Sequence, residues 1–403
     1  MIRRMIAFTL MLAFAFTGAG CSAAPRGHRT ADRAPVAVHR VAPVDAGDGA
    51  AGVHGLSLVQ STGLSGEPGG VAADRDGTVV AVDNDSVVAL DIDDHEVWTT
   101  PVPGAGLGWP LLGGGKVVVP TLRDDPGPGG CVALDRTTGA RVWIYEEPAS
   151  EGVAVASAGP DVLCALSTGI VVALDRATGA RRWRAVVVPH AARSAVSIPE
   201  RTALVVDGRT GRVVFSASVG RGWIAAELDL ATGSDRGAFD FRQVGPVSAP
   251  VSLAPGVVAI GLSGSRDVCT LDLARGRVAS CVPVPVPEGF DPASVPLVAG
   301  GLLVLAGRDG SVTAIDLAAH EVRWSVRVPN PILSARPVVS GGIVTFTDWT
   351  RVAWAVRLAD GSPGEVPKID GWAIGTVADA HGAFGVVKRC LDAGWIERWA
   401  PLR

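Results

Sequence analysis

Short apolar runs alternate with polar turns along the chain, and this pattern predicts strands rather than helices. Residues 88–91, 132–135 and 172–175 all read Val-Ala-Leu-Asp, and residues 313–316 read Thr-Ala-Ile-Asp. Weaker copies are Ala-Glu-Leu-Asp at 226–229, Cys-Thr-Leu-Asp at 269–272 and Trp-Ala-Val-Arg at 354–357. The chain is therefore expected to repeat one strand-turn-strand unit.

The spacing of these copies predicts the fold. Their last residues follow one another at intervals of 44, 40, 54, 43, 44 and 41 residues. A period in the low forties is typical of a β-propeller, in which each repeat forms one four-stranded blade. We predict an all-β, eight-bladed β-propeller over residues 53–403; seven blades is the alternative, because residues 189–222 are irregular. A strand near 56–60 should complete the last blade and close the ring.

The turn after each copy has its own chemistry. Asp135, Asp175 and Asp229 are each followed by Thr three residues later and Gly four residues later. An Asp carboxylate can accept backbone N–H groups of the turn, and Gly takes a positive φ without strain. We expect a hairpin between the two outer strands of a blade. A tryptophan on the returning strand should lie between blades and donate its N–H to a carbonyl; these residues are Trp98, Trp143, Trp183 and Trp324.

Composition narrows the choice of function. Hydrophobic residues make up 48% of the chain, enough for a large core, and the 51 Gly and 28 Pro suit many tight turns. A net charge of −4 without a basic run argues against a nucleic-acid partner. Residues 74–77 and 91–94 cluster carboxylates, but we interpret both as turns rather than Ca²⁺ loops. His95 and His320 replace the turn Gly and are interpreted as turn residues. No catalytic or metal motif is found.

The N-terminus predicts a targeting segment. Arg3 and Arg4 precede an apolar run that is too short to span a bilayer, and Gly-Ala-Gly-Cys ends it at Cys21. We predict a lipoprotein signal peptide over 1–20, lipidation of Cys21 and a flexible tether over 21–52. The chain would then be anchored at the extracytoplasmic face of the cell membrane.

The remaining cysteines suggest disulfides. Cys269 and Cys281 flank a predicted turn almost symmetrically, so they should face each other across a hairpin. Cys131 and Cys164 are a second candidate pair, between blades two and three. Cys390 would then be left over. The alternative is that all five are small buried residues.

These units resemble the PQQ-like propeller repeat of quinoprotein alcohol dehydrogenases and of the BamB-like envelope lipoproteins. The resemblance implies the fold and leaves the function open. Quinoprotein dehydrogenases carry an adjacent Cys-Cys pair at the cofactor, and this chain has none. It also lacks a CxxCH haem motif. We therefore expect no cofactor and no enzymatic activity.

A partner is expected to bind the face opposite the Asp-x-x-Thr-Gly hairpins. The loops of that face are rich in Trp and Arg, which dominate interface hot spots. The candidates are Trp109, His190, Arg193, Arg336, Trp349 and Trp372. A protruding loop is also expected around 208–222, where the repeat is about ten residues longer than elsewhere. The alternative is that these Trp residues only cap the central channel.

Three functions follow from this interpretation. The favoured one is a monomeric protein-interaction scaffold, with an unidentified envelope protein as its partner. The second is a propeller that binds or senses a small, quinone-like ligand. The third is an enzyme, for which the sequence offers no convergent set of ionisable groups.

Overall fold

The computed structural model builds the described part of the chain from strands, and the residues it describes include no helix. They all lie in residues 35–403, the larger of two compact units; the other is 1–34. Within them no helix could cross a membrane. The described residues are 56–64, 68–74, 76–83, 85–93, 95–105, 109–122, 129–148, 150–187, 196–197, 204–219, 222–240, 250–262, 267–283, 296–307, 309–316, 318–319, 321–328, 332, 337–340, 342–347, 352–368, 372–378, 384–390 and 393–401, with side chains only between 70 and 362.

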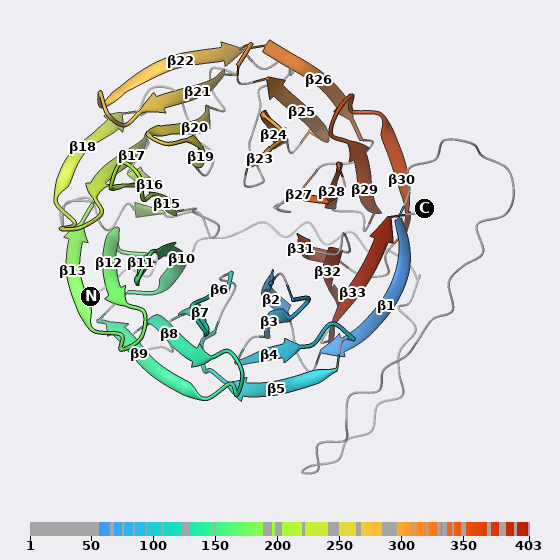
Figure 1. The fold of residues 1–403 in the computed structure, drawn as a ribbon, viewed down its shortest axis with the longest axis horizontal. Coiled ribbons are helices and arrows are strands. Elements are labelled where there is room, and N and C mark those ends of the chain that lie inside the picture. The colour runs from blue at the N-terminus through green and yellow to red at the C-terminus, as the bar shows by residue number, and fades with distance from the viewer. Residues whose placement is uncertain are drawn as a thin grey trace, which may run out of the picture. The chain divides into compact units, whose positions relative to one another are not determined.

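The strands form antiparallel sheets that follow one another around a ring (Figure 1). We number the sheets in chain order and give each from its innermost strand outward. Sheet 1 is β2 (Pro68–Ala73), β3 (Val79–Asp83), β4 (Ser86–Leu90) and β5 (Glu96–Pro101); sheet 2 is β6 (Leu111–Gly113), β7 (Lys116–Thr121), β8 (Gly129–Asp135) and β9 (Arg141–Glu147); sheet 3 is β10 (Gly152–Ala158), β11 (Asp161–Leu166), β12 (Ile170–Asp175) and β13 (Arg181–Val186).

The later sheets repeat this order, and sheet 4 has a fifth strand. Sheet 4 is β14 (Val196–Ser197), β15 (Leu204–Asp207), β16 (Arg212–Val219), β17 (Gly222–Asp229) and β18 (Asp235–Asp240); sheet 5 is β19 (Val251–Ala254), β20 (Val257–Leu262), β21 (Asp267–Asp272) and β22 (Arg277–Pro283); sheet 6 is β23 (Leu297–Ala299), β24 (Leu302–Ala306), β25 (Ser311–Asp316) and β26 (Glu321–Arg327); sheet 7 is β27 (Val338–Ser340), β28 (Ile343–Thr347), β29 (Val352–Arg357) and β30 (Pro363–Lys368); sheet 8 is β31 (Trp372–Ala378), β32 (Phe384–Cys390), β33 (Ala393–Pro401) and β1 (Leu56–Leu64). The predicted all-β propeller is confirmed.

Burial explains why the repeats read as apolar runs. In sheet 2 the middle strands β7 and β8 are buried along almost their whole length, whereas the outer strand β9 alternates between buried and exposed residues. Middle strands have a neighbouring sheet on both faces, so both faces must be apolar, and only the outer strand also meets solvent at the rim. Most core clusters accordingly join two sheets, as Val82 with Val117 and Val304 with Val344 do.

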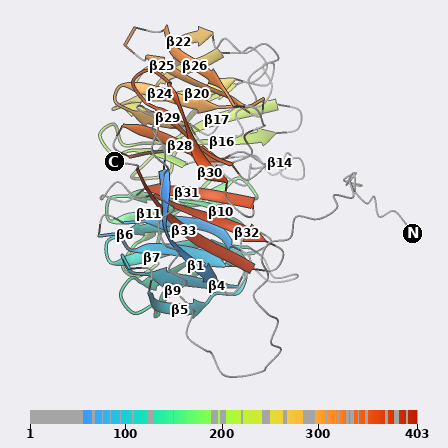
Figure 2. The same ribbon diagram turned by 90° about the vertical axis from the view of Figure 1, so that its right-hand side faces the viewer.

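The first strand closes the ring. β1 pairs antiparallel with β33, from Leu56 opposite Pro401 to Leu64 opposite Gly394, and the two lie side by side in Figure 2. Sheet 8 also packs on both neighbours, because β31 contacts β2 and β27. The predicted closure by the N-terminal strand is therefore confirmed, and it removes two free sheet edges.

The prediction of a protruding loop around residues 208–222 is wrong. Residues 208–211 form a turn, and β16 and β17 then continue as a long ladder that pairs Arg212 with Asp229 and Val219 with Gly222. The innermost strand of this sheet is split, because β14 and β15 pair with different parts of β16. The extra residues of this repeat therefore lengthen β16 and β17 and add a second short strand at the inner edge of the sheet.

Candidate functional site

The Asp-x-x-Thr-Gly segments form the turns between the third and fourth strands, as predicted. In sheet 2, Asp135 Oδ1 accepts the N–H groups of Thr137 and Thr138 at 3.0 Å and the Thr138 hydroxyl at 3.1 Å. Asp175 and Asp229 repeat these contacts. Such donors stabilise the ionised carboxylate, so the Thr138 N–H above all lowers the pKa of Asp135.

Each tryptophan of the repeat wedges its sheet against the next one. The Trp143 indole N–H of sheet 2 donates to the carbonyl of Arg176 in sheet 3 at 2.8 Å. The same bond runs from Trp98 to Arg136, from Trp183 to Leu230 and from Trp324 to Leu358, at 2.8 to 2.9 Å. The predicted position of these rings between blades, with a carbonyl partner, is confirmed.

Two features of the structure exclude a side chain at the turn glycines: a positive φ and a close approach to a tryptophan. Gly179 has a φ of 72°, as expected, but a Cβ there would also lie 2.7 Å from Cγ of Trp143 in the preceding sheet. Gly139, Gly233 and Gly361 lie in the same way on Trp98, Trp183 and Trp324. The ring of one sheet therefore rests directly on the turn backbone of the next.

The carboxylates of residues 74–77 are held by an arginine. Asp74 and Asp76 lie on the turn between β2 and β3, and Arg136 of sheet 2 pairs with both, at 3.2 Å from Asp74 Oδ2. Gly77 N–H donates to the Asp74 carbonyl at 3.1 Å, as in an ordinary tight turn. Within the described residues no group of three or more His, Cys, Asp and Glu could hold a metal ion. The segment is a turn stabilised by ion pairs between sheets.

The turns lie on two faces of the ring. In sheet 3 the N–H of Arg176, directly after the motif Asp, donates to the carbonyl of Pro160 in the β10–β11 turn at 3.0 Å. Equivalent bonds join Leu273 to Gly256 and Leu358 to Gly342. We call this side the hairpin face. Because antiparallel strands alternate in direction, the turns between second and third strands and the links between sheets lie on the other side, the linker face.

Of the six residues predicted to bind a partner, Trp109 and Trp372 lie within the described part of the chain. His190, Arg193, Arg336 and Trp349 lie outside the described residues. Trp109 precedes β6 and is half-buried against the core cluster of sheet 1 that includes Val71. Trp372 is the first residue of β31, and its side chain is not among those described. Trp109 therefore packs against sheet 1.

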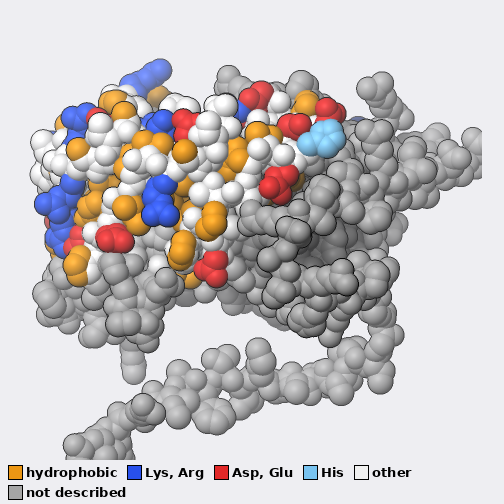
Figure 3. Space-filling view, turned by 90° about the horizontal axis from the view of Figure 1, so that it is seen from below, with side chains coloured by type: hydrophobic (Ala, Val, Ile, Leu, Met, Phe, Trp, Pro, Cys, Tyr) orange, Lys and Arg blue, Asp and Glu red, His pale blue; other side chains and the backbone are white. Residues whose placement is uncertain are grey.

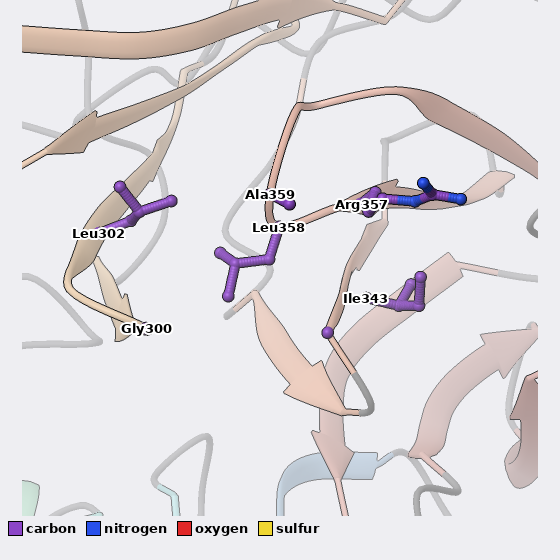
Figure 4. Close-up of a pocket in the computed structure, with 7 residues that line it drawn as sticks. Gly300, Leu302, Ile343, Arg357, Leu358 and Ala359 are labelled. Carbon is purple, nitrogen blue, oxygen red and sulfur yellow. The ribbon is translucent and has the colours of Figure 1, made fainter.

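A pocket lies instead on the hairpin face, between sheets 6 and 7. It has a volume of about 490 Å³ and is lined by Gly300, Leu302, Gly342, Ile343, Arg357, Leu358 and Ala359. Leu302 and Leu358 point toward each other across it, and the Arg357 side chain extends beside Ile343 (Figure 4). Sequence reasoning missed this pocket, because its walls come from three segments, residues 300–302, 342–343 and 357–359, that belong to two different sheets.

The joint between sheets 4 and 5 is built differently. Gly237 stands at the strand position of the tryptophan, and Glu227 stands opposite it where the repeats that carry the tryptophan have Ala. Glu227 is 3% exposed and pairs with Arg212 Nε at 3.0 Å. Burial raises the pKa of Glu227, although Arg212 and Arg236 act to lower it. A Cβ at Gly237 or at the turn residue Gly276 would meet no described atom within 4 Å.

Two disulfides lie in different places in the ring. Cys269 and Cys281 bond directly across the β21–β22 ladder, with Cα atoms 4.0 Å apart. Cys131 and Cys164 bond between sheets 2 and 3, where their Cα atoms are 6.6 Å apart. Neither is the adjacent pair that quinoprotein dehydrogenases place against their cofactor, so the described cysteines do not fit that group. Cys390 ends β32, whose side chains are not described.

The rim presents mixed chemistry. Seen from its edge, the described surface intersperses apolar and charged side chains (Figure 3). Exposed apolar residues include Ile144 on β9 and Val186 on β13. Beside them Arg184 pairs with Glu147 at 2.8 Å across the joint of sheets 2 and 3. The rim of this joint is thus held by an ion pair as well as by the disulfide inside.

Comparison with protein families places the chain. A family model described as the outer membrane protein assembly factor BamB matches residues 39–280 and 266–364, which together are most of the sequence. The chain belongs to the BamB family. No curated protein matches it.

Solved structures share the fold of this BamB-family chain. BamB from Moraxella catarrhalis is 17% identical, covers 86% of this chain and 99% of its own, and has a TM-score of 0.65. A europium-containing methanol dehydrogenase is 14% identical, covers 86% and 93% of the two chains, and has a TM-score of 0.66. A quinohemoprotein alcohol dehydrogenase from Comamonas testosteroni is 16% identical, covers 86% and 77%, and has a TM-score of 0.63. These likenesses concern the fold alone.

Proposed function

We propose that this chain is a lipid-anchored, extracytoplasmic propeller that acts as a protein-interaction scaffold in the cell envelope. The observation that carries the proposal is its membership of the BamB family, whose model is named after an assembly factor. A closed ring suits this role, because it holds two sets of turns in fixed positions without needing to move. The monomeric ring would present its faces to a larger envelope protein.

The anchor is the first part of the proposal. Residues 1–20 would be removed as a signal peptide, Cys21 would carry the acyl chains and 21–52 would act as a tether. Two acyl chains give stable anchoring, because each buried CH₂ contributes about 0.8 kcal/mol. Cys21→Ser should move the protein from the membrane fraction to the soluble extracytoplasmic fraction and abolish labelling by an alkyne-tagged palmitate. Unchanged labelling would contradict the assignment of Cys21.

The linker face is the proposed docking surface, through Trp109, His190, Arg193, Arg336, Trp349 and Trp372. A photo-cross-linking amino acid placed at position 193 or 336 in intact cells should yield a discrete adduct with one envelope protein. The matched control is the same probe at Ile144, which is 49% exposed on the rim. Equal adducts from all three positions, or none from 193 and 336, would overturn this docking surface.

Binding of a quinone-like ligand is the second candidate, and the fold shared with quinoprotein dehydrogenases favours it. The intact chain would be titrated with pyrroloquinoline quinone and Ca²⁺ while Trp fluorescence and melting temperature are recorded. A ligand that binds only the folded state raises the melting temperature. Saturable quenching with such a rise would support the ligand-binding function, and no response would support the scaffold.

A further inference from the structure

The seventh copy of the repeat replaces its motif carboxylate with Arg357. At the same position the other copies have Asp91, Asp135, Asp175, Asp229, Asp272 and Asp316. The turn forms without that carboxylate: Gly361 N–H donates to the Arg357 carbonyl at 2.8 Å, as Gly179 N–H does to Asp175. Asp360 takes over as acceptor and bonds the N–H of Ser362 at 2.9 Å. The turn itself therefore does not require an arginine.

Arg357 reverses the charge of the motif position on the hairpin face. The motif positions of the other sheets carry carboxylates on this face, and only here among the seven copies is the charge positive. Arg357 Nη1 lies 4.0 Å from Asp360 Oδ2, and both side chains are exposed, at 39% and 55%. An exposed pair of this kind contributes little stability and is easily exchanged for another carboxylate.

Arg357 is one of the residues that line the apolar pocket. Leu302 and Leu358 face each other across it, and the Arg357 side chain extends on the other side of Leu358, beside Ile343 (Figure 4). Gly342 stands at the edge, where even a Cβ would meet no described atom within 4 Å. A volume of about 490 Å³ is enough for one or two aliphatic side chains, with an anionic group held at the arginine.

We infer that this pocket binds an extended segment of a partner protein in which an aliphatic side chain lies next to a carboxylate. The aliphatic group would lie between Leu302 and Leu358, and the carboxylate would pair with Arg357. A peptide fits better than a fatty acid, because the pocket is open to the face and is formed by turn tips, whereas an acyl chain requires an enclosed cavity. The inference rests on the proposed scaffold function and adds a second docking site on the opposite face.

The test uses the intact chain and a defined set of peptides. The probes are N-acetylated, C-amidated hexapeptides that place Leu, Ile or Val next to one or two Glu residues, with Gln counterparts and with decanoate as the lipid arm. Binding is followed by methyl NMR of Leu302, Ile343 and Leu358. At least one Glu peptide should bind about two- to fivefold more tightly than its Gln counterpart and shift these methyl groups, since an exposed ion pair contributes up to about 1 kcal/mol.

Arg357→Asp supplies the specific variant, because Asp at this position is compatible with the turn in the other sheets. It should weaken Glu-peptide binding about tenfold and leave the melting temperature within a few degrees. Arg327→Asp is the control: it makes the same charge change on an exposed residue at the end of β26, away from the pocket-lining residues.

Several outcomes would overturn the inference. They are equal binding of Glu and Gln peptides, equal loss in both variants, binding of decanoate alone, and no binding by any peptide. The scaffold proposal is tested separately by cross-links from the linker face, so those adducts would persist if only the pocket assignment fails.

Discussion

The joint between sheets 2 and 3 and the joint between sheets 4 and 5 solve one packing problem in different ways. In the first, the Trp143 ring lies on Gly179 and donates to Arg176. In the second, the ring is absent and Gly237 stands in its place. A wedge at the rim is therefore one solution and not a requirement of the fold.

The joint between sheets 4 and 5 is held by an apolar cluster and by a hydrogen bond between two inner turns. Phe239 packs with Val258, Ile260 and Leu271 in a cluster that spans sheets 4 and 5. Asp207 of sheet 4 accepts the N–H of Gly256 in sheet 5. The Phe239 ring, the apolar area it buries and one charge-assisted bond can substitute for the tryptophan, because apolar burial is not directional. The repeat therefore determines the four-stranded sheets and their order in the ring, whereas the side chains that join neighbouring sheets differ from one joint to the next.

The largest expected effect comes from removing a wedge. Trp143→Ala should lower the free energy of unfolding by about 3–5 kcal/mol, because a buried aromatic residue is lost and a cavity remains. Trp143→Phe keeps a ring but loses the bond to Arg176, and it should cost less. Chemical denaturation measures both. A loss below about 1 kcal/mol in the alanine variant would mean that the wedge contributes no more than an ordinary surface residue.

A matched pair of glycines sharpens the comparison. Gly179→Ala and Gly276→Ala both place a side chain at positive φ, at 72° and 58°. That strain should cost each about 1–2 kcal/mol. Only Gly179 also meets Trp143, so its variant should lose about 1–3 kcal/mol more through overpacking. Equal losses in denaturant unfolding would show that the ring does not rest on the turn.

Acid should weaken both kinds of joint alike. Hydrogen bonds from Arg236 and Thr232 lower the pKa of Asp229 from 3.8 to about 2, and Arg275 lowers that of Asp272. A carboxyl whose pKa is lower in the folded state contributes stability above its unfolded pKa and loses it as the pH falls. The melting temperature should fall between pH 4 and about 2. Asp229→Asn should reduce this slope, and an unchanged slope would contradict the capping role.

The smallest effect is expected at Glu227. Burial raises its pKa, so the folded state holds the proton more tightly and stability declines as the pH rises above 4.5. Glu227→Gln mimics the protonated form and should raise the melting temperature by about 1–3 °C at pH 7, with a smaller gain at pH 4.5. A clear loss at pH 7 would mean that the ion pair with Arg212 outweighs the cost of burial.

Much of the ring is predictable because each repeat contains the residues that form its own turn and its contact with the next sheet. The Asp of the turn, the Thr hydroxyl and the Trp N–H act over a few residues or between equivalent positions of consecutive repeats. The same motif can still mislead. Asp207, Thr210 and Gly211 have the identical spacing, yet they form the inner β15–β16 turn and not an outer one. Pairing with β17 decides their place, and a short motif contains no information about it.

The candidate site was less predictable. In two places the residue directly after the motif position lies against the inner turn of the preceding sheet. Arg136 pairs there with Asp74 and Asp76. Leu358 lies there beside Gly300. No period within one repeat shows this relation, because it depends on the rotation from one sheet to the next. Arg357 was visible as a departure from Asp, but Leu302 becomes its neighbour in the pocket only because sheets 6 and 7 pack together.

The pairing of β1 with β33 has a consequence for how the protein is made. A ribosome delivers β1 hundreds of residues before its partner strand, so the earliest segment of the ring must wait for the latest. Contacts so distant in sequence slow folding, and a waiting strand exposes its hydrogen-bonding edge to other chains. Refolding of the denatured chain should therefore be slow, because the β1–β33 ladder can form only after nearly the whole chain has been brought together.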